Sequence, residues 1–298
     1  MKNNEMIENK TMKTIRPIFS GGMATDPRKG FTLVEVAVII AMVALLFSLR
    51  LVAIAGAQNQ NKIAQCAANL RQVTLAVQIY GGENSDKLPI LSPPSAASWP
   101  WDLPWKIGDV LLSCGLQKKN FYCPGTAPRF SDLANFGDPT LDAGGYPKNL
   151  WDFGSSVKYP AGPFHIAGYV FAFSGMQCKL LASAQNTTLQ SERTPNPTNL
   201  LFPRVYISAS DRVLTADATI CSPAGVASTP VSARYNTALY PTLTYTEVVG
   251  GFYLHHLSPH LKGPFPAGGN VGFKDGHVTW RKFDDMSQRA SSGQSFWW

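Results

Sequence analysis

The amino-terminal part of the chain contains one long run of apolar residues. From Val36 to Leu49 there are 14 residues without a charge, and starting at Phe31 gives 19 residues interrupted only by Glu35. A helix over this run would be roughly 28 Å long, close to the hydrocarbon thickness of a bilayer, about 30 Å. Basic residues precede the run. The pattern predicts a membrane-spanning helix whose amino end stays in the cytoplasm and whose following residues are exported.

Beyond this run the apolar positions recur with helical spacing. Steps of three and four residues place six of them on one face of an α-helix: Ile63, Cys66, Leu70, Val73, Val77 and Tyr80. Gly81 and Gly82 then predict the end of the helix. We expect one helix of about 50 residues, with a membrane-spanning first half, residues 31–51, and an amphipathic second half, residues 52–82. The alternative is a separate domain helix over residues 58–80.

Residues 83–298 predict an exported globular head that is rich in loops and mainly antiparallel β. Short strand patterns cover 169–173 and 212–216, and a long polar connector covers 183–199. A hairpin with an Asp-Gly turn is expected over 270–280. The fold class predicted from these patterns is α+β, with the long amino-terminal helix packed on the β-rich head.

Composition supports a loop-rich head and argues against nucleic acid as a partner. Only 15% of the 298 residues are charged, and the chain has 25 Gly and 22 Pro. The formal net charge of +7 is spread without a Lys/Arg run, so we expect no nucleic-acid partner. Trp99, Trp101 and Trp105 lie in a Pro-rich stretch that predicts an irregular, partly buried segment. A sugar-binding aromatic platform is the alternative.

A motif stands at the head of the apolar run. The order Arg28-Lys29-Gly30-Phe31, followed by Glu35, resembles the type IV prepilins and the pseudopilins of type II secretion. Their signature is a basic leader, a Gly before the cut, a Phe after it and a Glu five residues into the mature chain. The resemblance implies a leader over residues 1–30, and a prepilin peptidase that cleaves after Gly30 and methylates the new amino group of Phe31.

Glu35 is the residue that the resemblance assigns to assembly. A carboxylate in the middle of a membrane costs about 2.5–3.5 kcal/mol, so it needs compensation. The ammonium group created on Phe31 of a neighbouring subunit would supply it once both helices are buried in a filament. The implied partners are the prepilin peptidase, other pilin or pseudopilin subunits, the inner-membrane assembly platform and the lipid bilayer. The implied location is the bacterial inner membrane, with the head periplasmic or extracellular, and a filament after processing.

A second resemblance, to large pilin-like proteins of planctomycete and verrucomicrobial type, extends along the chain. These proteins are named H-X9-DG for a His ahead of an Asp-Gly pair. At the position of that His this chain has Phe265, and 14 residues separate His260 from Asp275. The matching segments are Cys66 to Gln72, Cys123-Pro124, Leu214 to Asp217, Gly268 to Asn270 and Asp275 to Val278.

The five cysteines contain no C-x-x-C pair, which excludes zinc-ribbon and thioredoxin-like arrangements. We expect a disulfide between Cys66 on the helix and Cys123 in the head. Histidines and aspartates could converge in the head, but their spacing predicts no ready-made metal site. Asp217 and Asp275 are the weak candidates, with calcium as the ion. The histidines considered with them are His255, His256, His260 and His277.

The chain lacks the sequence motifs of the common enzyme classes, so we do not expect an enzyme. The predicted function is a structural pseudopilin or minor pilin. One alternative is an exported enzyme or ligand-binding protein released by ordinary signal peptidase, because Ala53-Ile-Ala55 and Ala55-Gly-Ala57 both have the small-x-small pattern. Another is an uncleaved, anchored receptor.

Overall fold

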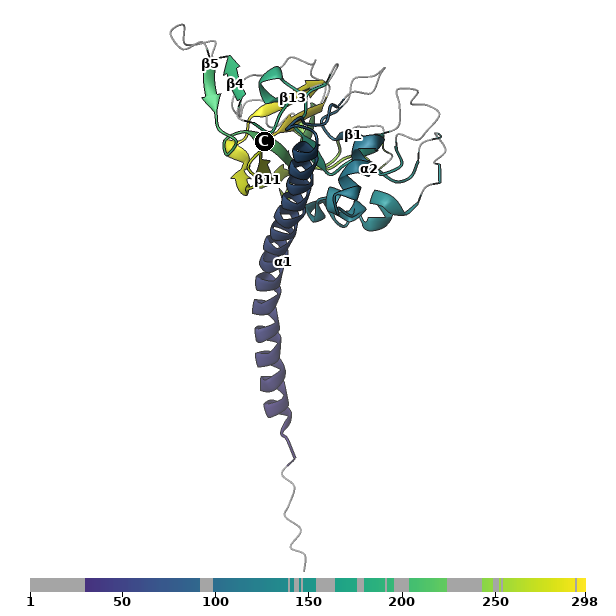
Figure 1. The fold of residues 1–298 in the computed structure, drawn as a ribbon. Coiled ribbons are helices and arrows are strands. Elements are labelled where there is room, and N and C mark those ends of the chain that lie inside the picture. The colour runs from purple at the N-terminus through teal and green to yellow at the C-terminus, as the bar shows by residue number, and fades with distance from the viewer. Residues whose placement is uncertain are drawn as a thin grey trace, which may run out of the picture. The chain divides into compact units, whose positions relative to one another are not determined.

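The structure is a computed structural model of the 298-residue chain. It describes residues 30–91, 99–138, 140–141, 145, 147–153, 164–175, 180–190, 192–195, 204–223, 243–248, 252, 254–292 and 294–298. The chain divides into two compact units, residues 1–52 and residues 53–298. Figure 1 shows the elements in chain order, and each unit is described by itself.

The first element is the long helix α1, Leu33–Glu83, which has 51 residues. Thr32 and Glu35 form a capping box at its start, because Glu35 N–H donates to Thr32 Oγ1 (3.2 Å) and Thr32 N–H donates to Glu35 Oε2 (2.8 Å). The helix was expected to end at Gly81-Gly82, but it ends at Glu83. Both glycines stay helical, and the chain leaves the helix through Ser85 and Asp86, whose φ angles are 56° and 61°.

The prediction that the first half of this helix spans a membrane is wrong. Among the helices in the described part of the chain, none combines the length and apolarity that a membrane span requires. The fold class is therefore corrected: the long helix and the antiparallel sheets are present, but no helix of the described residues has the properties of a membrane span.

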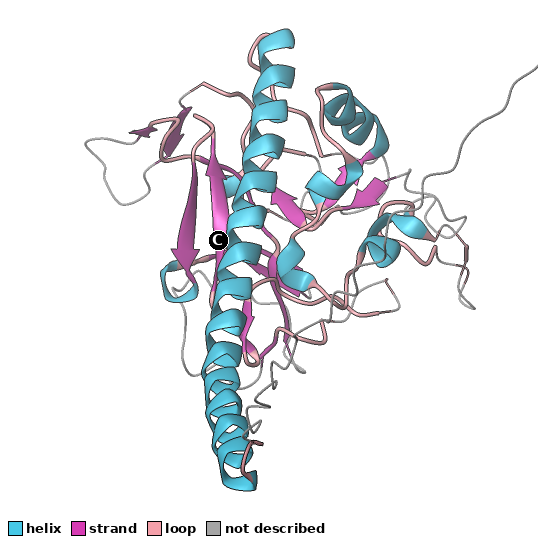
Figure 2. Ribbon diagram, turned by 90° about the horizontal axis from the view of Figure 1, so that it is seen from below, coloured by secondary structure: helices cyan, strands magenta, loops and turns pink. Residues whose placement is uncertain are grey.

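The apolar stripe on the later part of α1 is confirmed. Cys66, Leu70, Val73 and Val77 are fully buried, while Ile63 and Tyr80 at the two ends are half-buried. This part of the helix lies along strands of the head, as Figure 2 shows. The contact is direct, because the hydroxyls of Thr74 in α1 and Thr215 in the head are 2.9 Å apart.

The sheet beneath α1 has four antiparallel strands in the order β12-β11-β6-β3. These strands are β3 (Tyr169–Phe171), β6 (Val213–Asp217), β11 (Gly268–Phe273) and β12 (Val278–Lys282). They confirm the strands predicted near 169 and 212 and the carboxy-terminal hairpin. Its turn contains Gly276 at φ 93°, a left-handed conformation that Gly adopts without strain.

A second four-stranded antiparallel sheet has the order β13-β14-β7-β8. Its strands are β7 (Thr219–Pro223), β8 (Leu243–Thr244), β13 (Gln288–Ser292) and β14 (Gln294–Trp297). Ala218 alone separates β6 from β7, so the chain passes directly from the first sheet to the second.

Short elements complete the head. Three strand pairs are β1 (Asp102–Pro104) with β2 (Phe164–Ile166), β4 (Glu192–Pro195) with β5 (Arg204–Ile207), and β9 (Leu261–Lys262) with β10 (Phe265–Pro266). The helical segments are α2 (Trp105–Ser113), η1 (Lys118–Phe121), η2 (Pro124–Thr126), η3 (Leu133–Gly137), η5 (Ala182–Ala184) and η7 (Phe283–Asp285). Strand β4 lies inside the segment 183–199, which was predicted to be a connector.

The Trp-rich stretch contributes to the core. Trp101 is 7% exposed and packs edge-on against Phe296, with ring centroids 5.0 Å apart. Trp99 and Trp105 are partly buried. The expected burial is confirmed for these three rings, and Trp101 is not available to a sugar-binding platform. The expectation of an irregular segment is wrong in its last part, because β1 (Asp102–Pro104) lies there and α2 begins at Trp105, while residues 92–98 lie outside the described residues.

Candidate functional site

The amino-terminal motif is accessible. Gly30 and Phe31 precede the first turn of α1, and Phe31 is 78% exposed. No atom lies within 4 Å of the position where a Cβ on Gly30 would stand. Arg28 and Lys29, the predicted basic leader residues, lie outside the described residues. The peptide bond between Gly30 and Phe31 is therefore open to a protease.

Glu35 has a local partner that the sequence analysis missed. Besides the capping box, the hydroxyl of Thr32 donates to Glu35 Oε2 at 2.9 Å. The hydrogen bonds from the backbone and the side chain of Thr32 lower the pKa of Glu35, so its carboxyl group is charged at neutral pH. The signal was available in the sequence, because Thr followed three residues later by Glu is a capping-box pattern.

Apolar side chains around this part of α1 are exposed. Their exposed fractions range from 43% for Val43 to 85% for Leu33. The group comprises Leu33, Val34, Val36, Val38, Ile39, Ile40, Met42, Val43, Leu45 and Leu46. We call these ten residues the apolar surface of α1. Glu35 lies within it and carries its one described charge.

A second candidate site is buried inside the head. The side chains of Cys66, Cys123, Asp217 and His260 meet there, and one ligand-type atom from each lies within 4.8 Å of the others. All four residues are at most 2% exposed. We call this group the buried cluster.

Four different elements contribute one residue each to the buried cluster. Cys66 comes from the buried stripe of α1, and Cys123 precedes Pro124 as the N-cap of η2. Asp217 is the last residue of β6, and His260 precedes β9. His260 has a φ of 53°, a left-handed conformation that is uncommon for a residue with a side chain.

The contacts within the buried cluster run from Cys66 through Asp217 and His260 to Cys123. Cys66 Sγ donates to Asp217 Oδ1 at 2.7 Å, and His260 Nε2 lies 3.4 Å from Asp217 Oδ2. Cys123 Sγ lies 3.2 Å from His260 Nε2. The carboxylate of Asp217 therefore contacts both a thiol and the imidazole.

Further groups donate to the cluster from outside. The backbone N–H of Asn270 donates to Asp217 Oδ2 at 2.6 Å, and its side-chain Nδ2 donates to the same oxygen at 3.3 Å. The N–H of Gly125 donates to Cys123 Sγ at 3.3 Å, and the hydroxyl of Tyr169 lies 3.5 Å from Cys66 Sγ. Polar groups from outside the cluster thus contact the carboxylate of Asp217 and both cysteine sulfurs.

Burial and mutual contact shift the pKa values of the cluster. Burial raises the pKa of the Cys66 thiol well above its usual value and that of Cys123 to about 11. Burial alone would lower the pKa of His260, but hydrogen bonds with Asp217 and Cys66 outweigh it and raise the value to about 10. At neutral pH the two cysteines are therefore thiols and His260 is an imidazolium.

The predicted disulfide between Cys66 and Cys123 is absent, although the two residues do meet. Both are free thiols. Each sulfur faces a different polar group, Asp217 for Cys66 and His260 for Cys123. The prediction that Cys66 and Cys123 lie close together is thus confirmed, but the predicted disulfide between them is wrong.

The two predicted weak metal candidates separate in the structure. Asp217 belongs to the buried cluster, whereas Asp275 is part of the exposed hairpin turn and contacts His277 at 2.5 Å. His255 contacts Glu247 at 3.4 Å, and His256 is buried among aromatic rings. Of the histidines considered from the sequence, only His260 is in the cluster.

The buried cluster does not have the properties of a catalytic Cys-His-Asp triad. In such a triad the two ring nitrogens of the His contact different partners, but here Nε2 of His260 faces both Cys123 and Asp217. Reactive cysteines are accessible and have a lowered pKa, whereas Cys123 is buried with a pKa raised to about 11. The geometry favours a role in holding the fold together.

Comparison with known proteins gives no family for this chain. No family model, no curated protein and no solved structure matches it.

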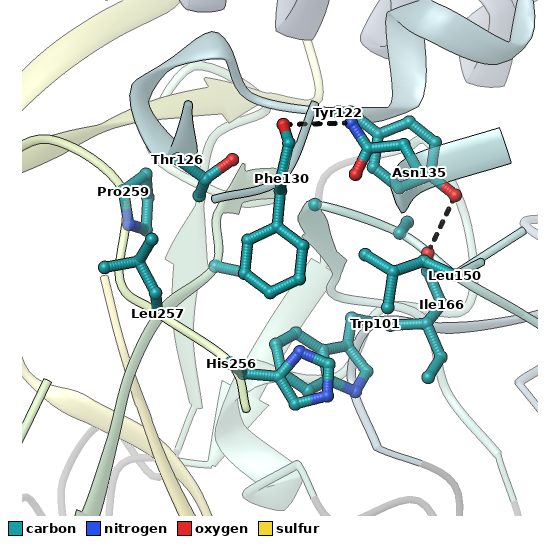
Figure 3. A pocket seen from close by; sticks show the side chains of 13 residues that line it. Trp101, Tyr122, Thr126, Phe130, Asn135, Leu150, Ile166, His256, Leu257 and Pro259 are labelled. Atoms are coloured by element: carbon teal, nitrogen blue, oxygen red, sulfur yellow. Dashed lines mark hydrogen bonds between the residues drawn. The ribbon is translucent and has the colours of Figure 1, made fainter. Parts of the chain in front are cut away.

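The head also contains a small cavity beside Trp101 and His256. Figure 3 shows the side chains that line it, with Phe130 and Leu257 among them. The space open to water-sized molecules is about 30 Å³, enough for roughly two waters. Tyr122 OH donates a hydrogen bond to the carbonyl of Ile166 at 3.1 Å. This cavity is too small for an organic substrate.

Proposed function

We propose that this chain is a pilin-like structural subunit, made as a prepilin, cut between Gly30 and Phe31 by a prepilin peptidase and assembled with other pilin-type subunits into a filament. The filament is of the type II secretion or type IV pilus kind. The observation that carries the proposal is the apolar surface of α1 with a single carboxylate, Glu35, one turn from an accessible Gly-Phe bond.

The apolar surface needs a partner. Contiguous exposed apolar side chains of this extent mark interaction sites, and complete burial of one Val, Leu, Ile or Met side chain contributes about 1.5–3 kcal/mol. Helices of other subunits with the same character fit this surface, because side chains spaced by three and four residues interdigitate as ridges and grooves. The occupant we propose is therefore the equivalent helix of another pilin-type subunit.

Glu35 links assembly to cleavage. Packing the apolar surface against another helix would remove the carboxylate from water, and an unpaired buried charge is strongly destabilising. Cleavage after Gly30 creates an ammonium group on Phe31, which can pair with Glu35 of the neighbouring subunit. The hydrogen bonds from Thr32 stabilise the charged carboxylate that this pairing requires. An uncleaved chain lacks the partner charge at this point.

Two substitutions separate the charge of Glu35 from its capping role. Glu35→Gln removes the charge, yet Gln also serves in a capping box. Thr32→Ala removes the cap, at a cost of about 1 kcal/mol, and leaves the charge. We expect the peptidase to process both variants normally. Breaking a buried ion pair costs about 3–5 kcal/mol, so Glu35→Gln should reduce filament incorporation about a hundredfold or more, while Thr32→Ala assembles.

The measurement is the amount of processed variant in sheared, pelleted filaments relative to the amount in cells. Incorporation of Glu35→Gln at the wild-type level would remove the charge-pair argument. If Thr32→Ala failed while Glu35→Gln assembled, Glu35 would have a role in capping α1 only.

A further inference from the structure

The buried cluster has the composition of a closed metal site, and two of its contacts have lengths close to those that such a site requires. In a tetrahedral zinc site the bonds are about 2.3 Å to sulfur and about 2.0–2.2 Å to nitrogen and oxygen, so neighbouring ligand atoms lie roughly 3.3–3.8 Å apart. In the cluster, Cys123 Sγ and His260 Nε2 are 3.2 Å apart, and His260 Nε2 and Asp217 Oδ2 are 3.4 Å apart. Two of the edges of such a tetrahedron are therefore already present to within a few tenths of an ångström.

The ligand types identify the ion. Two thiolates, one imidazole and one carboxylate suit a borderline-soft cation, whereas calcium and magnesium take oxygen ligands almost exclusively. The ligands also saturate four-fold coordination, and the site is closed to solvent, since each residue is at most 2% exposed. Closed sites with four protein ligands are structural rather than catalytic.

We propose that Cys66, Cys123, Asp217 and His260 bind one structural Zn²⁺ ion that ties α1 to the head. The site is independent of the filament proposal, because all four residues belong to the unit of residues 53–298. It would connect a residue of the long helix to η2, β6 and the segment before β9.

Zinc takes the place of three protons. Binding releases one proton from each thiol of Cys66 and Cys123 and one from the His260 imidazolium, so that two thiolates and one carboxylate give the zinc centre a net charge of −1. The N–H groups that already point at it, from Gly125 to Cys123 Sγ and from Asn270 to Asp217 Oδ2, stabilise that charge. Donors of this kind orient zinc ligands and are part of a metal site.

The test begins with full-length protein, purified under reducing conditions from cells grown with added zinc. Elemental analysis should find one zinc per chain. Cys66→Ala and Cys123→Ala should each lower the zinc content at least tenfold. The matched control is Cys221→Ala, since Cys221 is also a buried free cysteine but accepts a hydrogen bond from Trp297 instead of facing the cluster. This variant should keep its zinc.

A spectroscopic measurement on the wild-type chain avoids variants that fail to fold. Zinc is removed with a chelator and replaced with Co²⁺, which should give thiolate-to-cobalt charge-transfer bands and the intense visible bands of tetrahedral coordination. The melting temperature should fall on removal and recover when zinc is added. The inference is overturned if the wild type holds no zinc, if copper or another metal is bound in its place, if Cys221→Ala loses the metal as the other two variants do, or if mass spectrometry finds Cys66 and Cys123 joined as a disulfide.

Discussion

The hydroxyl of Thr74 on α1 lies 2.9 Å from the hydroxyl of Thr215 on β6, and both side chains are fully buried. Thr74 also donates to the carbonyl of Leu70 within α1 at 2.8 Å. Gly272 of β11 lies beside this pair and leaves the room that the two hydroxyls fill. The packing of α1 on the first sheet therefore depends on a position without a side chain.

Gly272→Ala should destabilise the head. A Cβ there would stand 2.6 Å from Thr74 Oγ1 and 2.7 Å from Thr215 Oγ1, closer than real contacts allow. Overpacking of this kind costs about 1–3 kcal/mol. Chemical denaturation measures the free energy of unfolding. The control is Gly82→Ala in the last turn of α1, where no atom lies within 4 Å and the change should be neutral or slightly stabilising. Equal effects of the two substitutions would contradict this packing.

Arg212→Met should be far more destabilising than Arg129→Met. The buried guanidinium of Arg212 donates to Asn186 Oδ1 and to the carbonyl of Ser183, both at 2.6 Å, and these acceptors would lose their donor. Charged hydrogen bonds of this kind contribute about 1.5–3 kcal/mol each, so we expect a loss of about 3 kcal/mol or more. Arg129 pairs with Glu247 at the surface, where such a pair contributes at most about 1 kcal/mol. Thermal unfolding of both variants checks the order.

His256 should make the head sensitive to acid. Burial, with a smaller contribution from the neighbouring His255, lowers its pKa to about 3, so the folded ring stays neutral where an unfolded His takes up a proton. Stability is then complete above about pH 6.5 and falls as the pH drops toward 3, with a slope of about 1.4 kcal/mol per pH unit for this group. His165, with a pKa lowered to about 4, acts in the same direction.

The substitution His256→Phe checks this slope. Phenylalanine retains an aromatic ring next to Trp101, whose centroid is 4.4 Å from that of His256, but it does not titrate. Urea unfolding at several pH values below 6.5 gives the free energy of unfolding as a function of pH. Its slope should be smaller in the variant than in the wild type by about 1.4 kcal/mol per pH unit, the contribution of one proton. The same slope in the variant and the wild type would show that His256 is not the group that titrates.

Much of the fold near α1 could be predicted because it follows from periodicity. The predicted stripe repeats every three to four residues, and its four members from Cys66 to Val77 are buried, while Ile63 and Tyr80 at its ends are half-buried. The hairpin of β11 and β12 carries an Asp-Gly turn between apolar runs, a local signal that needs no tertiary information. Polar connectors have no such period, and strand β4 was missed for that reason.

The buried cluster could be predicted only in part. Cys66 was placed by helical periodicity, and its pairing with Cys123 was anticipated. His260 and Asp217 join them because the loop before β9 and the end of β6 come together in space, at separations of up to 194 residues from Cys66 that leave no local pattern. The membrane-spanning prediction failed for a different reason. Glu35 interrupts the apolar run from Phe31 to Leu49, and the described helix does not combine the length and apolarity that a membrane span requires.

The amino terminus of the mature chain tests the central proposal most directly. Mass spectrometry of protein from cells with and without prepilin peptidase should find N-methylated Phe31 only when the peptidase is present. Gly30→Ala should block this cleavage without disturbing the chain, since its Cβ meets no atom within 4 Å. A mature chain that begins at Phe31 supports the pilin-like subunit. One that begins at Gly56 or Gln58, or that retains its leader, contradicts it.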